Sequence, residues 1–412
     1  MNRSLSSKVP ASVYFIAAAV LLCVAVQASH PVGTYSRLGT LLLFPAVAAC
    51  AAGIFVSSQR QPTLSITPPK RLLKILLLAA LLYHCIASIS MLRYYRGDNI
   101  DVYLFQHHAA RALLHAVDPY TLTTENIYGP STEFYGPGVV VNGRVEIGMP
   151  YPPASLFFVL PAYVMGDIRY AYLAAVLMSA VVIAALDVNL MTVGVACFLL
   201  LNSVTLYIEL KSWTEPFVLF TLTCVLYAAV KKSWWLPVAL GIFLASKQYS
   251  LLALPFIPFL LGERRWKPAW RLLAESLGVF AAVTLPMAFW NAGGFWRDMV
   301  LVHIRQPFRK DALTLGNLLF PIPMVAIAAL VMLAVVFAMR KARPHPSMFA
   351  AVYGFTLLIF VSTNKQAFCN YYFLIVQTLL LSVAAGIPSA TPTPSLERSP
   401  QHELALELVG SS

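Results

Sequence analysis

Residues Arg93 to Pro153 have the sequence RYYRGDNIDVYLFQHHAARALLHAVDPYTLTTENIYGPSTEFYGPGVVVNGRVEIGMPYPP, the one long polar interval in an otherwise almost continuously apolar chain. Six of the 17 acidic residues of the chain fall here, namely Asp98, Asp101, Asp118, Glu125, Glu133 and Glu146. A solvated loop with incidental charge is the simplest interpretation. A loop that only connects two membrane helices needs few polar residues, however, so this concentration of carboxylates favours a chemical use for some of them.

The composition indicates an all-α polytopic membrane protein. Of 412 residues, 59% are hydrophobic and 11% are charged, whereas about a quarter of the residues in soluble domains are charged. The net charge of +12 could suggest a nucleic-acid partner. The lysines and arginines instead form short clusters between apolar runs, as they do in cytoplasmic loops of membrane proteins, so we expect no nucleic acid. The six scattered cysteines lack the C-x-x-C spacing of a metal site and indicate no disulfide framework.

Apolar runs of roughly 20 residues are expected to cross the bilayer as helices, because backbone polar groups in lipid must be satisfied within the segment. About twelve such spans are predicted. They fall near residues 12–29, 38–57, 72–92, 169–187, 190–208, 215–231, 233–246, 249–262, 271–290, 316–339, 347–362 and 371–387. The first resembles a signal peptide, but an apolar segment follows within ten residues, so we favour an uncleaved anchor.

The positions of lysine and arginine predict the orientation, since cytoplasmic loops are enriched in both. The clusters at 60–74, 231–232, 264–271 and 340–343 share one side only if the short run Ala154–Met165 does not cross the membrane. That run is therefore predicted to be a helix on the outer leaflet. Four parts result: three N-terminal helices over 1–92, a first loop over 93–168, a helix bundle over 169–387 with a second loop over 291–315, and a disordered tail over 388–412. We expect both loops outside, both termini in the cytoplasm, and the protein in a bacterial inner membrane.

Two carboxylates of the first loop are candidates for a general base. Asp98 and Asp101 directly follow the third predicted span, at the level of lipid headgroups. Partial removal from water raises the pKa of a carboxylate, which makes it a better proton acceptor near neutral pH if a nearby cation keeps it ionised. The alternative is that each carboxylate stabilises the N-terminus of the amphipathic helix predicted over 100–117.

Several cations are candidates for binding an anionic ligand. Lys247 interrupts an apolar run from Trp234 to Leu261, where an ionisable group is costly and suggests function; the alternative is a lysine in a turn between two spans. The second loop carries His303 and Arg305, and Lys365 lies in a later outer loop. Together these cations would suit a lipid-linked phosphate, although solvated loop charge explains any single one. His107, His108 and His115 match no metal-ligand pattern, so no metal is expected.

The order of motifs resembles the first outer loop of GT-C superfamily glycosyltransferases, and most of all glycosyltransferase family 87. Asp101-x-Tyr103 precedes an amphipathic helix, Asp118-Pro119-Tyr120 follows it, and Tyr151-Pro152-Pro153 leads an apolar helix. Lys247-Gln248 is similar to the family's lysine followed by proline or glutamine. The resemblance covers about residues 90–375, and two extra spans precede it here.

The resemblance implies a GT-C-like bundle in which the Tyr-Pro-Pro helix lies beside the membrane. It implies an inverting transferase that moves a hexose, mannose in family 87, from a polyprenyl phosphate to a lipid or glycan acceptor, without a metal or other cofactor. Asp101 corresponds to the family's base, with Asp98 as a second candidate. The remaining candidate substrate-binding residues are Lys247, Gln248, His303, Arg305, Lys365, Tyr103 and Tyr151. A transporter or flippase for lipid-linked glycans, and a polymerase or ligase of surface polysaccharide, are the competing hypotheses.

Overall fold

The computed structural model describes residues 9–29, 36–59, 68–97, 100–129, 134–318 and 320–386. The tail predicted over 388–412 lies outside these ranges. Within them the chain is a helical membrane protein with seven helices long and apolar enough to cross a bilayer. These are α1 (Ala11–Ala28), α2 (Arg37–Leu41) with α3 (Leu43–Ser57), α4 (Lys70–Tyr94), α7 (Arg169–Leu186), α13 (Trp266–Trp290), α16 (Met324–Lys341) and α17 (Pro346–Thr363).

Shorter helices occupy the remaining predicted spans. They are α10 (Glu215–Val230), α11 (Leu236–Leu244), the 3-10 helix η2 (Gln248–Phe256) with α12 (Ile257–Leu260), and α18 (Cys369–Ala384). The segment predicted as one span over 190–208 is instead two helices, α8 (Leu190–Leu201) and α9 (Ser203–Leu210), bent by 52°. The bend forms because the Asn202 side chain accepts a hydrogen bond from Val204 N at 3.0 Å and thereby caps a new helix. Every predicted span has a helical counterpart, but only seven, or eight with this pair, meet the length criterion.

Proline explains two further differences from the predicted spans. The segment predicted to begin at residue 316 starts as α16 only at Met324, immediately after Pro321 and Pro323, since proline disfavours helix in the residue before it. The predicted helix over 249–262 is largely 3-10 helix around Pro255, where the missing N–H removes an α-helical hydrogen bond.

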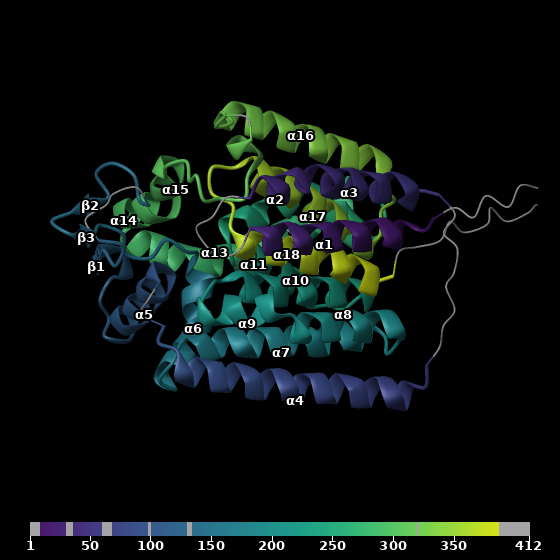
Figure 1. Ribbon diagram of the computed structural model, residues 1–412, viewed down its shortest axis with the longest axis horizontal. Helices are drawn as coiled ribbons and strands as arrows, with labels where there is room; N and C mark the ends of the chain where they lie inside the picture. Colours follow the sequence, from purple (N-terminus) through teal and green to yellow (C-terminus); the bar gives the residue numbers. More distant parts are fainter. Residues whose placement is uncertain are drawn as a thin grey trace, which may run out of the picture.

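The loops gather at one end of the bundle, which we call the loop end: residues 100–168, 211–215, 245–248, 291–318 and 362–368. Figure 1 shows the strands, α5 (Asp101–Leu114), α14 (Ala292–Trp296) and α15 (Val302–Arg305) together at the left of the bundle. The two ends of the described chain lie at the right. There Lys231 Nζ donates to Leu186 O at 2.9 Å, and Arg264 donates to Ala342 O at 2.7 Å. We call this opposite end the basic end. The predicted loop clusters and basic clusters therefore lie at opposite ends.

The short helix α6 (Pro153–Val164) forms where a non-crossing helix is predicted. Its 12 residues span about 18 Å, too little for a hydrocarbon core of about 30 Å. Gly166, with φ +104°, ends the helix, and the N–H groups of Gly166 and Asp167 bond back to its last turn. The helix packs on α5 and α7 at the loop end, as a helix beside the membrane would.

The first loop also contains the hairpin predicted about Asn142-Gly143. Strands β2 (Val140–Val141) and β3 (Arg144–Val145) pair antiparallel, and β1 (Thr124–Glu125) pairs with the other edge of β3. Asn142 and Gly143 have φ values of 50° and 76°, as a type I′ turn requires. A small apolar cluster beneath the sheet joins it to α5 and α15; its buried members are Phe105, Tyr135, Val145, Ile147 and Val302.

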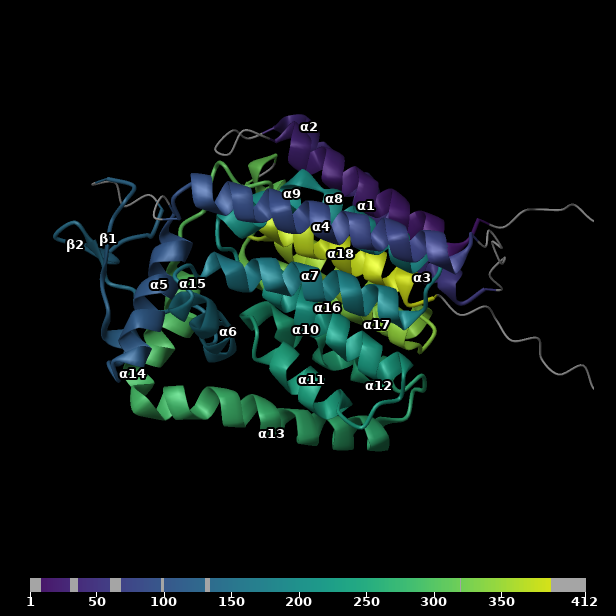
Figure 2. The same ribbon diagram turned by 90° about the horizontal axis from the view of Figure 1, so that it is seen from below.

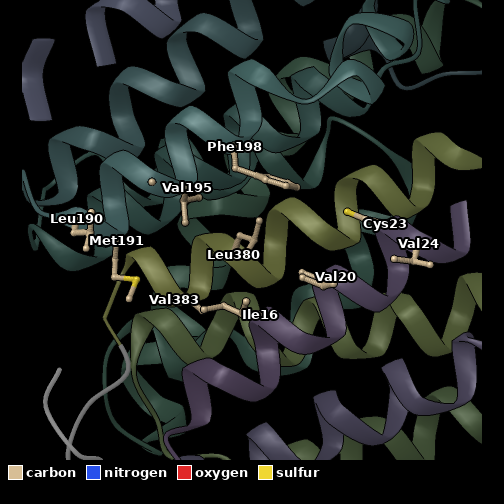
Figure 3. Close-up of a pocket in the computed structure, with 12 residues that line it drawn as sticks. Ile16, Val20, Cys23, Val24, Leu190, Met191, Val195, Phe198, Leu380 and Val383 are labelled. Carbon is tan, nitrogen blue, oxygen red and sulfur yellow. The ribbon is translucent and has the colours of Figure 1, made fainter. Parts of the chain in front are cut away.

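Helices at the flanks of the bundle leave apolar grooves open to the surrounding lipid. Figure 2 shows α13 along one flank, with α11 beside it. One such groove, of about 310 Å³, lies between α1, α8 and α18 and is lined by side chains such as Ile16, Phe198 and Leu380 (Figure 3). None of its lining residues is charged, so this groove offers no group for acid–base chemistry.

Candidate functional site

Asp101 is the first residue of α5 and lies at the loop end. Its carboxylate accepts hydrogen bonds from Val102 N at 2.8 Å, Tyr135 Oη at 3.0 Å and Tyr128 Oη at 3.2 Å. Burial raises the pKa of Asp101 above its ordinary value, while these hydrogen bonds and the positive charge of Arg309 oppose the rise. The balance gives a carboxylate that is held in a fixed direction and is more basic than one in water.

Lys247 lies in the turn between α11 and η2, at the loop end. Its Nζ donates to Thr214 Oγ1 at 2.5 Å and lies 3.3 Å from Glu215 Oε1. Glu215 is fully buried at the start of α10, and Oε1 also accepts from Tyr249 Oη at 2.9 Å. The structure therefore gives Lys247 a carboxylate partner within the protein, which the sequence did not predict.

Tyr151 contacts Lys247 and lies near the carboxylates of Asp101 and Glu215. The Lys247 ammonium is 4.4 Å from the centre of its ring, a cation–π contact. Burial raises the pKa of the Tyr151 hydroxyl, and the negative charges of Asp101 and Glu215 add to the rise because both lie near it. This tyrosine thus brings together the acidic and basic candidates that lie 146 residues apart in the sequence.

Gln248 and His303 hold the segment that carries Tyr151. Gln248 Nε2 and His303 Nε2 each donate to the carbonyl oxygen of Pro150 at 3.0 Å, and the two nitrogens are 3.0 Å apart. Burial lowers the pKa of His303, as does the charge of Lys247, so the imidazole tends to be neutral although the Pro150 bond opposes this shift. Both side chains therefore position the Tyr-Pro-Pro segment.

Lys365 and the cations of the second loop are less buried than Lys247. Lys365 Nζ donates to Ile304 O at 2.6 Å and ties a later loop to this one. Arg305 is exposed at the end of α15. Arg309 pairs with Asp311 at 2.5 Å, and its guanidinium lies 4.2 Å from the ring centre of Phe134. Of these three cations, Arg309 is the one whose charge acts on Asp101.

Tyr103 occupies a different face of α5 from Asp101, since residues two apart on a helix project in nearly opposite directions. Its ring stacks on His107 at 5.5 Å and lies 5.8 Å from the Arg169 guanidinium. These contacts place Tyr103 beside Arg169, the first residue of α7. Asp98, the second candidate base, lies outside the described residues.

A buried aspartate joins the two loops. Asp298, in the second loop, accepts hydrogen bonds from Gly148 N at 2.9 Å and Met149 N at 3.2 Å, and from Arg297 Nε at 2.7 Å. Arg297 also donates to Tyr120 O at 2.5 Å. Burial raises the pKa of Asp298, and the pairing with Arg297 opposes that rise. Because Met149 directly precedes Pro150 and Tyr151, the hydrogen bonds to Asp298 fix the same segment that Gln248 and His303 hold.

The residues of this arrangement that were not among the sequence candidates include Tyr128, Tyr135, Glu215 and Tyr249. Glu215 had a usable signal, because a carboxylate directly before Pro216 at the head of an apolar run is costly unless a buried cation pairs with it. The two tyrosines of the first loop had none, because their approach to Asp101 depends on the turns around the small sheet. Within the described ranges, no three histidine, cysteine, aspartate or glutamate side chains gather as metal ligands would.

Comparison with known proteins gives limited similarity. No known family and no curated protein matches the sequence. Two solved structures of ArnT from Cupriavidus metallidurans resemble the chain, each at 16% sequence identity. The one bound to undecaprenyl phosphate covers 82% of this chain with a TM-score of 0.49, and the apo structure covers 90% with a TM-score of 0.42. The chain spans 62% of the length of each ArnT chain. Its function must therefore be inferred from its own residues.

Proposed function

We propose that the protein is a GT-C-type membrane glycosyltransferase. It transfers a hexose, which we take to be mannose, from a polyprenyl-phosphate donor to a lipid or glycan acceptor at the loop end. The observation that carries the proposal is that Tyr151 contacts the buried Lys247 and lies within electrostatic reach of Asp101, a carboxylate suited to remove a proton. The resemblance of the Asp-x-Tyr to Tyr-Pro-Pro motifs to family 87 supports the same activity.

In this mechanism Asp101 takes the proton of the acceptor hydroxyl as the acceptor oxygen bonds to the anomeric carbon. The bond from that carbon to the phosphate oxygen breaks, and the lipid phosphate leaves with the electron pair. Attack from the side opposite the leaving group inverts the configuration of the sugar. A base with a raised pKa takes up the proton more favourably, and fixed cations stabilise the charge on the departing phosphate.

The cations would share the binding of the phosphate. Thr214, Glu215 and the Tyr151 ring surround the Lys247 ammonium, so we assign Lys247 to the phosphate through its charge. Because Glu215 offsets the charge of Lys247, net positive charge must come from the second loop. We assign that contribution to Arg305, with Lys365 beside it, while Gln248 and His303 hold Tyr151 in place to stack on the sugar.

An apolar groove beside the site suits the lipid chain of the donor. It has a volume of about 470 Å³ and runs between α6, α10, α11 and α13, with Phe157, Trp235 and Val283 among its lining residues. Phe158 stacks on Phe217 at 4.3 Å within this lining. Since Phe217 is two residues beyond Glu215, a chain in the groove would end near Lys247.

The transporter hypothesis expects ionisable groups within the spans, and the described part of the chain has such a pair. His84 Nε2 and Glu209 Oε1 are 2.8 Å apart, and Glu209 also accepts from Ser88 Oγ at 2.5 Å. The other ring nitrogen of His84 lies 2.6 Å from Leu200 O. These side chains are satisfied by one another and tie α4 to the bent pair α8–α9, which favours a structural role over a transport path.

We further propose that the loop end faces outward from a bacterial inner membrane, with both termini in the cytoplasm. The gathering of lysine and arginine at the basic end supports this orientation, because cytoplasmic loops carry these residues in excess.

The test of the proposed activity is incubation of the purified full chain with radiolabelled polyprenyl-phosphate mannose and, separately, other hexose donors, in membranes that contain the native acceptors. We expect label to move from mannose donor to a lipid or glycan. Glu125→Gln is the matched control for changes at Asp101, because Glu125 is an exposed carboxylate of the same first loop. This variant should transfer sugar at the wild-type rate. Absence of transfer from every donor would refute the proposed activity, and transfer from another hexose alone would refute mannose.

A further inference from the structure

Four cations converge on one pocket at the basic end, far from the proposed active site. The pocket has a volume of about 560 Å³ and lies where α3, α16 and the turn before α13 meet. It is lined by Phe55, Ser58, Arg264, Arg340, Lys341, Ala342, Arg343 and Pro344. Half of these side chains are cationic and none is acidic.

The positively charged residues come from two separate parts of the chain. Arg264 precedes α13, and its guanidinium donates to Ala342 O at 2.7 Å, which holds it against the end of α16. Lys341 lies in the last turn of α16, with its ammonium 5.7 Å from the ring centre of Phe55 on α3. Like charges that line one pocket repel one another, so an anion bound there would lower the electrostatic energy of the lining.

The pocket lies at the depth of lipid headgroups. The apolar helices α3 and α16 both end at it. At the same end of the bundle, Trp266 and Trp270 are 50% and 61% exposed in the first turns of α13. Exposed tryptophans of this kind mark the membrane–water interface. An anion that enters the pocket from the side would therefore come from the bilayer.

We propose that this pocket binds the phosphodiester headgroup of an anionic phospholipid, such as phosphatidylglycerol, in the leaflet at the basic end. Basic pockets between membrane helices on the cytoplasmic side are suited to such headgroups. The bias of cytoplasmic loops towards lysine and arginine explains the presence of these charges. It does not explain their convergence around one cavity. A bound headgroup would link the N-terminal helices to α16 and α17, and this proposal is independent of the glycosyltransferase activity.

The test compares two double variants of the full chain in detergent, each of which removes one arginine and one lysine from the basic end. Arg340→Gln with Lys341→Gln alters the pocket. Arg265→Gln with Lys267→Gln is the control, because both residues are exposed and outside the lining. Each cation near an anionic lipid contributes about a fivefold factor in affinity. We therefore expect the pocket variant to bind phosphatidylglycerol about 30-fold more weakly, and the control to lose clearly less affinity because its residues do not line the pocket.

Native mass spectrometry measures the retained lipid, and melting temperature measures the stabilisation that the lipid gives. A swap of the two charges, Arg340→Lys with Lys341→Arg, should keep binding and shows whether charge rather than folding is responsible. Equal losses in the pocket and control variants, or wild-type binding of phosphatidylcholine as tight as that of phosphatidylglycerol, would overturn the proposal. Inorganic phosphate at the same concentration should give no stabilisation; equal stabilisation by phosphate would overturn the assignment to a lipid.

Discussion

Replacement of Tyr135 by phenylalanine tests whether hydrogen bonds keep Asp101 ionised, so that it can act as a base. The phenol donates to the carboxylate at 3.0 Å, and this hydrogen bond is the largest influence that lowers the pKa of Asp101 against the effect of burial. A hydrogen bond to an ionised group contributes about 1.5–3 kcal/mol, and one pKa unit corresponds to about 1.4 kcal/mol. The Tyr135→Phe variant should therefore raise the pKa of Asp101 further above its ordinary value.

The direction of the effect on activity follows from the role of Asp101 as a base. Only the ionised carboxylate can take a proton, so activity is lost as the pH falls through its pKa, and a higher pKa moves this loss to higher pH. The assay is the pH dependence of kcat/KM for transfer of radiolabelled sugar. Tyr163→Phe is the control, because Tyr163 contacts His107 on α5 rather than Asp101. An acidic limb that stays in place, or moves to lower pH, in Tyr135→Phe would refute the reasoning.

Three further predictions follow from the contacts of the site. Lys247→Met leaves the buried Glu215 carboxylate without its cation and should lower the free energy of unfolding by about 3–5 kcal/mol. Thermal unfolding should show that adding Glu215→Gln restores much of this loss. No recovery in the double variant would contradict the pairing. Gln248→Ala removes a donor to Pro150 O and should slow transfer by about 10- to 100-fold through misplacement of Tyr151, whereas an unchanged rate would exclude this positioning role. Asp298→Ala removes the hydrogen-bond acceptor that joins the two loops and should make the first loop more sensitive to limited proteolysis. Unchanged cleavage would argue against this role of Asp298.

Much of the fold follows from local sequence patterns. Apolar runs predicted where helices form, because the length of a run and its hydropathy decide whether a segment can cross lipid. The shortness of α6 and the Asn142-Gly143 turn were predictable for similar reasons, since proline, glycine and asparagine restrict the backbone locally. The break at Asn202 was not, because a capping asparagine within an apolar run is easily passed over when hydropathy alone is averaged.

The site was predictable only in part, because its essential contacts are distant in sequence. Asp101 and Lys247 stood out individually, as a carboxylate and a cation in places where charge is costly. That Glu215 would pair with Lys247 depends on how α10 packs beside α11, and no local pattern encodes that packing. In the same way, Gln248 and His303 were predicted to bind substrate, but their bonds to Pro150 O were not foreseeable from sequence.

The central claim is that Asp101 acts as the base while other groups bind the donor. The most direct measurement compares Asp101→Asn with the wild type in a single-turnover transfer assay, together with the affinity for the polyprenyl-phosphate donor. Loss of a general base slows transfer by about 10²- to 10⁴-fold, and we predict this loss with donor affinity unchanged within about threefold. Transfer by Asp101→Asn at the wild-type rate would contradict the account.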